Sequence, residues 1–189
     1  TAAMLGTLLG DASCRDHEFR FEHSTKQAAY VEWKRSLFAD LVPKTTDCTH
    51  EAVDVNSRDG RTAHVKRRTS RVVYLSGPHI TGELYRQCYS GPGGSKKVTE
   101  SWLNKLNGLS VALWVIDDGT ISGKGNITVS RHADGSLYRE KFSGSLCTQG
   151  FSRSEAELLR SWLSERYGVT CSVGADNRIT ISSKMCRAL

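Results

Sequence analysis

The chain has 189 residues, a formal net charge of +6 and a sequence pI near 9.1. A positive excess of this size favours a phosphate-bearing partner such as a nucleic acid. The sequence has no signal peptide and no apolar run of the roughly 20 residues that a membrane helix needs, which argues against a secreted or membrane protein.

The first half of the chain predicts two helices and a hairpin. Residues 4–11 (MLGTLLGD) are apolar on nearly every side, which is typical of a helix buried all round, and the run ends in the carboxylate of Asp11. Residues 25–41 predict an amphipathic helix. The dipeptide Asp59-Gly60 indicates the turn of a β-hairpin, because both residue types tolerate positive φ.

The predicted hairpin carries most of the positive charge. Residues 58–71 contain six Lys or Arg residues against one acid, Asp59. Basic residues within a hairpin place charge on a sheet face, where phosphates can neutralise it. The alternative is a solvated basic strand edge, since Lys and Arg also protect sheet edges from aggregation.

A break in the middle of the chain separates two halves of similar length. Residues 91–94 (GPGG) interrupt any regular element, so we predict domains at 1–92 and 93–189. Residues 100–107 predict a helix that leads into a second apolar run, residues 109–119 (LSVALWVIDDG), which resembles the first and also ends in acids.

The second half then predicts strands and one amphipathic helix. Residues 126–130 and 178–182 alternate polar and apolar side chains, as half-buried strands do, and the outward set of these predicted strands contains no acid. A turn at Asp134-Gly135 joins two strands. Residues 152–167 predict a helix capped by Ser152 and Glu155, with a buried stripe of Leu158, Leu159, Trp162 and Leu163.

The two apolar runs form a repeat, one in each half of the chain. Small residues allow two such helices to approach closely, and both runs have them: Gly6 and Gly10, then Ser110 and Ala112. A carboxylate at a helix C-terminus opposes the helix dipole and costs about 0.3–1 kcal/mol. Two carboxylates in this place therefore invite a hard divalent cation, which prefers oxygen ligands.

The two runs resemble the paired signature helices of the LAGLIDADG homing endonucleases, in the single-chain form with two motifs. The similarity continues in residues 21–38 (FEHSTKQAAYVEWKRSLF), 84–106 and 147–169, in the family's order. The resemblance implies an α+β fold of two pseudo-symmetric αββαββα half-domains. These would pack through their motif helices and present antiparallel sheets to DNA.

The resemblance also implies metal ligands. Asp11 and Asp118 would each bind a metal ion beside one scissile phosphate, and the backbone carbonyls of Gly10 and Asp117 would add ligands. The implied ion is Mg²⁺ or Mn²⁺, with Ca²⁺ as a substitute that does not support catalysis. Of the two successive acids, Asp118 rather than Asp117 aligns with Asp11.

Basic and amide residues near the two sites follow from the same motif positions. Lys97 is the better match to the family's basic residue, with its neighbour Lys96 left open. Arg178 occupies a position where the family usually has Lys, and a guanidinium cannot give up its proton as an amine can. Gln149 matches a glutamine that positions water, and Glu22 is its loosely aligned counterpart in the first half.

DNA sequence would be read by outward side chains of the strands in the major groove. Alternation, position and charge select the following candidates for DNA binding: Arg15, Arg20, Arg67, Arg71, Asn126, Thr128, Arg131 and Arg153.

The six cysteines show no Cys-x-x-Cys pair or regular spacing, which predicts free thiols in an intracellular, reducing compartment rather than a zinc site or disulfides. His23 is interpreted as structural.

The resulting hypothesis is a monomeric, metal-dependent endonuclease that needs no obligate protein partner. It would cut both strands of a long, asymmetric double-stranded DNA target. Two alternatives stay open on the same scaffold: an intron maturase that binds structured RNA, and a DNA-binding protein that does not cleave.

Overall fold

The structure is a computed structural model in which two compact units are distinguished. It describes residues 2–15, 17–38, 41–56, 62–75, 80–122, 129–131, 137–139 and 143–181. The N-terminal unit is Asp11–Gln87, and the C-terminal unit combines Thr1–Gly10 with Cys88–Leu189. The first helix thus belongs by its contacts to the C-terminal unit. The half-domain boundary between residues 92 and 93 stays a prediction.

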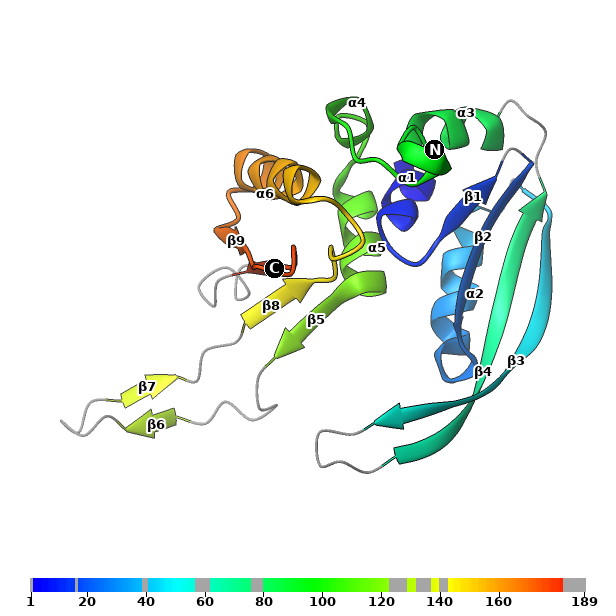
Figure 1. The fold of residues 1–189 in the computed structure, drawn as a ribbon, viewed down its shortest axis with the longest axis horizontal. Helices are drawn as coiled ribbons and strands as arrows, with labels where there is room; N and C mark the ends of the chain where they lie inside the picture. Colours follow the sequence, from blue (N-terminus) through cyan, green and yellow to red (C-terminus); the bar gives the residue numbers. More distant parts are fainter. Residues whose placement is uncertain are drawn as a thin grey trace. The chain divides into compact units, whose positions relative to one another are not determined.

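The N-terminal unit is a four-stranded antiparallel sheet with helices (Figure 1). The strands lie in the order β1-β2-β4-β3. Its elements are β1 Ser13–Arg15, β2 Glu18–Ser24, the 3-10 turn η1 Thr25–Gln27, α2 Ala28–Ser36, β3 Pro43–Asn56, β4 Thr62–Leu75 and α3 Thr81–Cys88, whose last residue is assigned to the other unit. The helix predicted over 25–41 is therefore shorter at both ends, and its first turn is 3-10.

Aromatic side chains form the core of the N-terminal unit. Strand β2 alternates strictly, so that Phe19, Phe21 and His23 are buried while the intervening residues are half-buried. The Phe19 ring packs edge-on against Phe38 at 5.7 Å, and Tyr74 lies 6.1 Å from Phe19 between ring centroids. This packing fixes which face of β2 points away from the core.

The C-terminal unit has a second four-stranded sheet and a separate two-stranded ribbon. The sheet order is β5-β8-β10-β9, and β6 pairs with β7. Its elements are α1 Ala2–Leu9, the 3-10 turn η2 Pro92–Gly94, α4 Glu100–Leu103, α5 Gly108–Asp118, β5 Gly119–Ser122, β6 Val129–Arg131, β7 Leu137–Arg139, β8 Ser143–Leu146, α6 Arg153–Tyr167, β9 Cys171–Val173 and β10 Ile179–Ile181.

The two sheets share one topology. In each, the first strand pairs with the second, the second with the fourth and the fourth with the third, all antiparallel. The second repeat differs by the β6–β7 ribbon inserted between β5 and β8. The predicted α+β fold with two related halves is confirmed.

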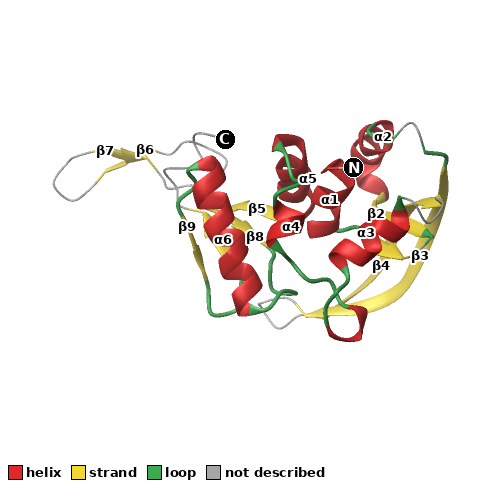
Figure 2. Cartoon of the chain, turned by 90° about the horizontal axis from the view of Figure 1, so that it is seen from above, coloured by secondary structure: helices red, strands yellow, loops and turns green. Residues whose placement is uncertain are grey.

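Helices α1 and α5, which contain the two apolar runs, pack against each other within the C-terminal unit (Figure 2). A Cβ atom at Gly6 would lie 2.2 Å from the backbone oxygen of Ser110, so the two backbones are in direct contact. The Ser110 hydroxyl donates to the carbonyl of Ala2 at 2.8 Å, and Trp102 Nε1 donates to the carbonyl of Leu5 at 3.2 Å. The predicted close packing of the two motif helices is confirmed.

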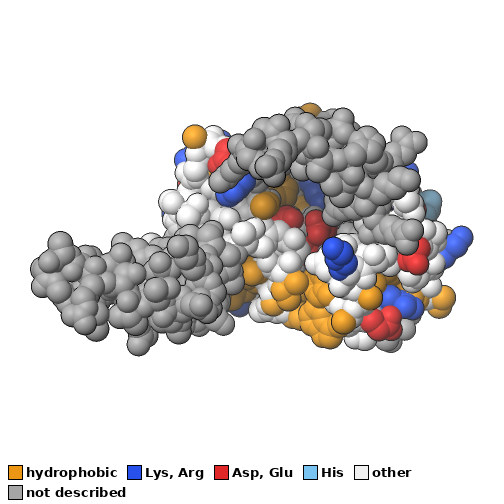
Figure 3. Space-filling model, turned by 90° about the horizontal axis from the view of Figure 1, so that it is seen from below, with side chains coloured by type: hydrophobic (Ala, Val, Ile, Leu, Met, Phe, Trp, Pro, Cys, Tyr) orange, Lys and Arg blue, Asp and Glu red, His pale blue; other side chains and the backbone are white. Residues whose placement is uncertain are grey.

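Burial differs between the two motif helices. Helix α1 is buried over residues 4–9, as its composition predicts. In α5, Leu109 and Ile116 are 40% and 50% exposed, so the expectation of a helix buried all round is wrong there. Figure 3 shows that apolar side chains, in orange, reach the surface of the described part of the chain.

Other local predictions hold to different degrees. Ser152 and Glu155 form the predicted capping box of α6, whose buried residues are Ala156, Leu159 and Leu163. Leu159 and Leu163 are buried as predicted, whereas Leu158 and Trp162 are only half-buried and Ala156 completes the buried stripe. Helix α4 ends at Leu103, short of the predicted 107. The turns at Asp59-Gly60 and Asp134-Gly135 lie outside the described residues.

None of the helices in the described ranges has the length and apolar character needed to span a bilayer. The five cysteines in those ranges are free thiols.

Candidate functional site

Asp11 lies in a small polar pocket of the N-terminal unit. The pocket has a volume of about 210 Å³. Its lining consists of Asp11, Ser13, Arg20, Phe21, Glu22 and Arg71. The Asp11 carboxylate is 42% exposed, which leaves it open to a ligand.

Glu22 is held beside Asp11 by two side chains of β4. The hydroxyl of Thr69 donates to Oε1 of Glu22, and Nε of Arg71 donates to Oε2 at 2.8 Å. The hydrogen bond to Glu22, followed by the Coulombic attraction of the same carboxylate, raises the pKa of Arg71. The pocket therefore contains two carboxylates, Asp11 and Glu22, and two guanidinium groups, Arg20 and Arg71.

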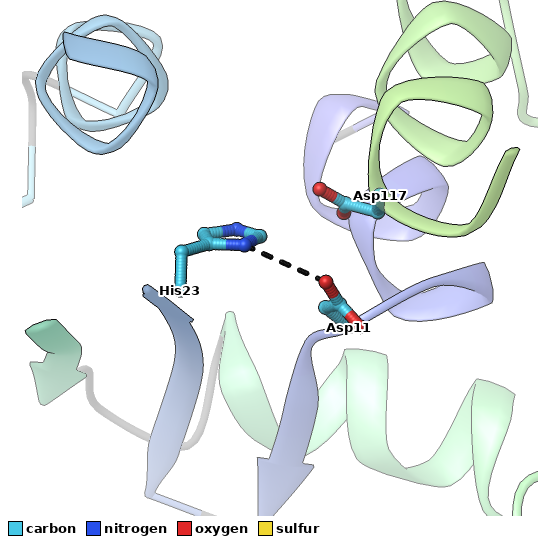
Figure 4. Close-up of side chains that lie close together, drawn as sticks. All are labelled: Asp11, His23 and Asp117. Carbon is cyan, nitrogen blue, oxygen red and sulfur yellow. Dashed lines mark ion pairs between the residues drawn. The ribbon is translucent and has the colours of Figure 1, made fainter. Parts of the chain in front are cut away.

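His23 contacts Asp11 from the buried face of β2. Its Nδ1 lies 3.5 Å from Oδ2 of Asp11, and Figure 4 shows the ring turned toward that carboxylate. The ring itself is 3% exposed. The interpretation of His23 as structural rather than catalytic stays a prediction, and the structure places its ring against a candidate metal ligand.

Asp118 lies in a larger pocket of the C-terminal unit, with a volume of about 450 Å³. Its lining is formed by Leu9, Gly10, Pro92, Ser95, Lys96, Asp118, Cys147, Gly150, Phe151, Ser152 and Glu155. Lys96 Nζ donates to the carbonyl oxygen of Gly10 at 3.3 Å. The pocket thus combines the carboxylates of Asp118 and Glu155 with a backbone carbonyl and an ammonium group.

The structure distinguishes Lys96 from Lys97. Lys96 is half-buried and lines the pocket with Asp118, whereas Lys97 is exposed and is not among the lining residues. Its backbone N–H donates to the carbonyl of Cys88 at 2.8 Å, which fixes this part of the chain. Lys96 is the better-placed residue, although the motif position favours Lys97.

The other predicted residues of this site lie around the pocket. Gln149 is exposed and does not line it, while its neighbours Cys147 and Gly150 do. Arg178 is also exposed, with Nε 3.6 Å from Oδ2 of Asp176. Asp117 is half-buried, and a Cβ atom at Gly10 would meet its Cβ at 2.6 Å.

The shared topology relates the two pockets residue by residue. Glu22 pairs with Arg71, and Ser13 with Arg20, so continuing the register places Asp11 opposite Glu22. In the other sheet Leu146 pairs with Gly119 and Ile179, which places Cys147 opposite Asp118 and Arg178 by the same step. The N–H of Cys147 donates to the carbonyl of Asp118 at 3.0 Å, in agreement with that step.

Each site therefore has an aspartate and an arginine in equivalent positions. The residue that lies between these two in the sheet differs from one site to the other. The N-terminal unit has Glu22, and the C-terminal unit has Cys147 in the corresponding place. The residue after it is His23 in one unit and Thr148 in the other, both buried.

The candidates for DNA binding are only partly placed. Arg15 is exposed on β1, whereas Arg20 lies 3.5 Å from Glu18, and Arg153 lies 2.7 Å from Glu157. Arg71 is paired with Glu22 as described above. Arg67 lies in β4 and Arg131 in β6, and Asn126 and Thr128 lie outside the described residues.

The outward face of β2 has acids, unlike the outward faces of the strands predicted at residues 126–130 and 178–182. This strand places Glu18 and Glu22 on the face away from the core, each beside an arginine. Asp47 of β3 is exposed as well and accepts a hydrogen bond from Ser70 at 2.8 Å. The signal was present in the sequence, because the alternation of β2 assigns its two glutamates to one face.

The comparisons with known proteins agree with this geometry. A family model described as "LAGLIDADG DNA endonuclease family" matches residues 1–185. The chain therefore belongs to the LAGLIDADG DNA endonuclease family.

Relatives and a solved structure give further similarity. The RecA proteins of Mycolicibacterium chitae and Mycolicibacterium flavescens are 27% and 29% identical over 88% of this chain, which covers 35% of each of them. The chain thus spans about a third of the length of these relatives. The homing endonuclease I-WcaI, bound to its DNA recognition sequence, has the same fold: the TM-score is 0.64 and the identity 21%, over 97% of this chain and 75% of that one.

Proposed function

We propose that this chain is a site-specific endonuclease that hydrolyses one phosphodiester in each strand of a double-stranded DNA target. Family membership and the same fold in a homing endonuclease that binds its DNA recognition sequence support a DNA substrate. The whole-protein activities of the RecA relatives are not part of this proposal, because most of their length lies outside the similarity.

The observation that carries the proposal is the presence of two topologically equivalent pockets, one with Asp11 and one with Asp118. Duplex DNA presents two scissile phosphates, and two equivalent sites supply one carboxylate for each. A protein that only binds DNA has no need of two acids that would face phosphates. Asp11 and Asp118 are therefore proposed as the catalytic acids.

The donor atoms fit a hard divalent cation. Asp118 and the carbonyl oxygen of Gly10 line one pocket, and Asp11 lies with Glu22 in the other. Such oxygen sets suit Mg²⁺ or Mn²⁺, and Ca²⁺ as a substitute that does not support catalysis. The chemistry supplied by such an ion is activation of a water molecule and neutralisation of charge on the phosphodiester. The carbonyl of Asp117 is proposed as a further ligand.

Basic side chains next to each carboxylate are proposed to neutralise the phosphate. Lys96 has this role in the Asp118 pocket, and Arg71, fixed by Glu22, in the Asp11 pocket. Arg178, Gln149 and Lys97 are proposed to contact DNA near the Asp118 site, since all three are exposed. Because the two pockets differ in residues, an asymmetric target fits the chain better than a palindrome.

The experiment is selection of cleaved sequences from a library of random or genomic duplex DNA in Mg²⁺, followed by cleavage of the selected target. Asp11→Asn and Asp118→Asn should each abolish double-strand cutting and retain target binding in Ca²⁺. Glu165→Gln, an exposed acid on α6, is the matched control and should cut as the unsubstituted protein does. Undiminished cutting by both asparagine variants would refute the assignment.

A further inference from the structure

The N-terminal unit contains a fully buried lysine close to the Asp11 pocket. Lys34 of α2 is 0% exposed. Its Nζ lies 4.6 Å from the ring centroid of Phe21 and 5.3 Å from that of Tyr30. A buried ammonium is rare and costly unless other groups compensate its charge, so its position calls for a partner.

One partner of the Lys34 amino group is the imidazole of His23. Nζ of Lys34 lies 3.1 Å from Nε2 of His23. The other ring nitrogen, Nδ1, is the atom that lies 3.5 Å from Oδ2 of Asp11. The three side chains therefore form a row, from a buried ammonium through a buried ring to a carboxylate that is open to its pocket.

The hydrogen-bonding chemistry of the three side chains determines which atom donates and which accepts at each contact. An ammonium group can only donate hydrogen bonds, so Nε2 of His23 must accept. In the tautomer that fits such a donor, the ring proton lies on Nδ1, the nitrogen that faces the carboxylate of Asp11. Aromatic contacts hold the ring in place: Tyr30 packs edge-on against it at 5.0 Å and Phe21 lies at 5.6 Å, measured between ring centroids.

We propose that Lys34 and His23 are positioning residues that fix the orientation of the Asp11 carboxylate. Lys34 fixes the tautomer of His23, and the contact of His23 with Oδ2 of Asp11 restricts rotation of the carboxylate. A carboxylate held in one orientation presents its lone pairs to a cation and a phosphate without first losing rotational freedom. This inference rests on the proposed endonuclease function, because it assigns Asp11 to one of the two cuts.

The pair formed by Lys34 and His23 has no equivalent among the described residues of the other unit. Thr148 takes the place of His23, and its hydroxyl donates to the carbonyl of Asn177 and accepts from the N–H of Ile179 at 3.1 Å. The buried residues of α6 are Ala156, Leu159 and Leu163, none of which can donate from its side chain. Loss of the pair should therefore affect one strand of the target and spare the other.

The activity test measures each strand separately, using a selected duplex target with a different fluorophore on each strand under single-turnover conditions. His23→Phe should slow the strand assigned to Asp11 by about 10- to 100-fold and raise the Mg²⁺ concentration needed for half-maximal cutting of that strand. The other strand should change by less than about threefold, within the scatter ordinarily seen between distant sites. Nicked product should accumulate.

Three further variants separate positioning from folding. His23→Asn keeps an N–H donor near the position of Nδ1 and should restore most of the lost rate. Lys34→Met keeps the buried stem, removes the charge and should slow the same strand as His23→Phe. Lys26→Met, at an exposed lysine of the neighbouring 3-10 turn, is the matched control and should show no strand bias.

A second readout needs neither metal nor DNA. In the metal-free protein labelled with ¹⁵N-histidine, long-range ¹H–¹⁵N correlations should show His23 neutral and protonated at Nδ1. Lys34→Met should shift the ring toward the Nε2-protonated form.

The results divide clearly. The positioning role would be overturned if His23 of the unsubstituted protein is protonated at Nε2. It would also be overturned if Lys34→Met and His23→Asn slow both strands equally while their melting temperatures stay unchanged. Unchanged cutting by His23→Phe would overturn it as well. If the unsubstituted protein cuts neither strand in Mg²⁺ or Mn²⁺, the endonuclease proposal fails instead, and the tautomer measurement still decides whether Lys34 sets the state of His23.

Discussion

Replacement of Gly6 by alanine sets two physical effects against each other. Helix propensity alone predicts that Gly6→Ala stabilises α1 by about 1 kcal/mol. In the structure, the added Cβ would lie 2.2, 2.5 and 2.6 Å from the backbone oxygen, Cα and carbonyl carbon of Ser110. Non-bonded heavy atoms normally stay about 3.5 Å apart, so α1 and α5 would have to separate by about 1 Å.

The cost of that separation exceeds the gain in propensity. Overpacking of a core contact costs about 1–3 kcal/mol. The hydrogen bonds from Ser110 to Ala2 and from Trp102 to Leu5 cross the same contact and would lengthen, each at about 1 kcal/mol. We expect a net loss of about 2–4 kcal/mol of unfolding free energy, equal to about 5–15 °C in melting temperature.

Urea titration and thermal melting followed by circular dichroism measure this loss. Gly108→Ala is the matched control, because Gly108 is also in a motif helix but has nothing within 4 Å of its added Cβ. It should be neutral or stabilised by up to about 1 kcal/mol. If Gly6→Ala melts at or above the temperature of the unsubstituted protein, the close approach of the two helices is refuted.

Three further predictions concern the pockets and the core. Lys96→Ala should slow cutting of the strand assigned to Asp118 by about 100-fold, which is the scale of losing one preorganised charge donor, and Lys97→Ala should slow it much less. Single-turnover rates measured for each strand check this. The reverse ranking would make Lys97 the basic residue of this site. Target binding should weaken steeply between about 50 and 200 mM salt, by a factor near 1,000 or more if six or more phosphates are contacted, and a flat response in a filter-binding titration would argue against a sheet that faces DNA. Burial raises the pKa of Tyr74 to about 12. The protonated phenol therefore contributes its full stability below 10.0, the pKa of the group in the unfolded chain, and this contribution is lost as the pH rises through about 12. Unfolding measurements from pH 9 to 12 should show a loss of about 2–3 kcal/mol that Tyr74→Phe lacks, and parallel curves for the two proteins would contradict this.

Local elements follow from the sequence because their signals are local. The capping residues Ser152 and Glu155 are three positions apart and begin α6 where predicted. The alternation of residues 178–182 puts Ile179 and Ile181 on the buried face of β10, as observed. The motif runs predict two helices that pack closely, since small residues at Gly6 and Ser110 leave room for contact.

The site is predicted less completely, because its residues meet through sheet register and packing. The motif position favours Lys97, but a single residue of rotation along an extended segment decides which lysine enters the pocket, and Lys96 does. Arg71 pairs with Glu22 only because β2 lies beside β4 in the sheet. A histidine on the apolar face of β2 and a lysine on the buried face of α2 were visible in the sequence as polar residues in apolar positions.

The sequence by itself determines the family, the two motif helices, the pair of catalytic aspartate candidates and the excess of positive charge. Each of these depends on residues close together in the chain or on composition. Only the tertiary structure decides that Glu22 and Arg71 share the pocket of Asp11 and that Lys34 reaches Asp11 through His23. The physical reason is that periodicity assigns a residue to a face of its element, whereas strand register and helix packing select the side chains that this face meets.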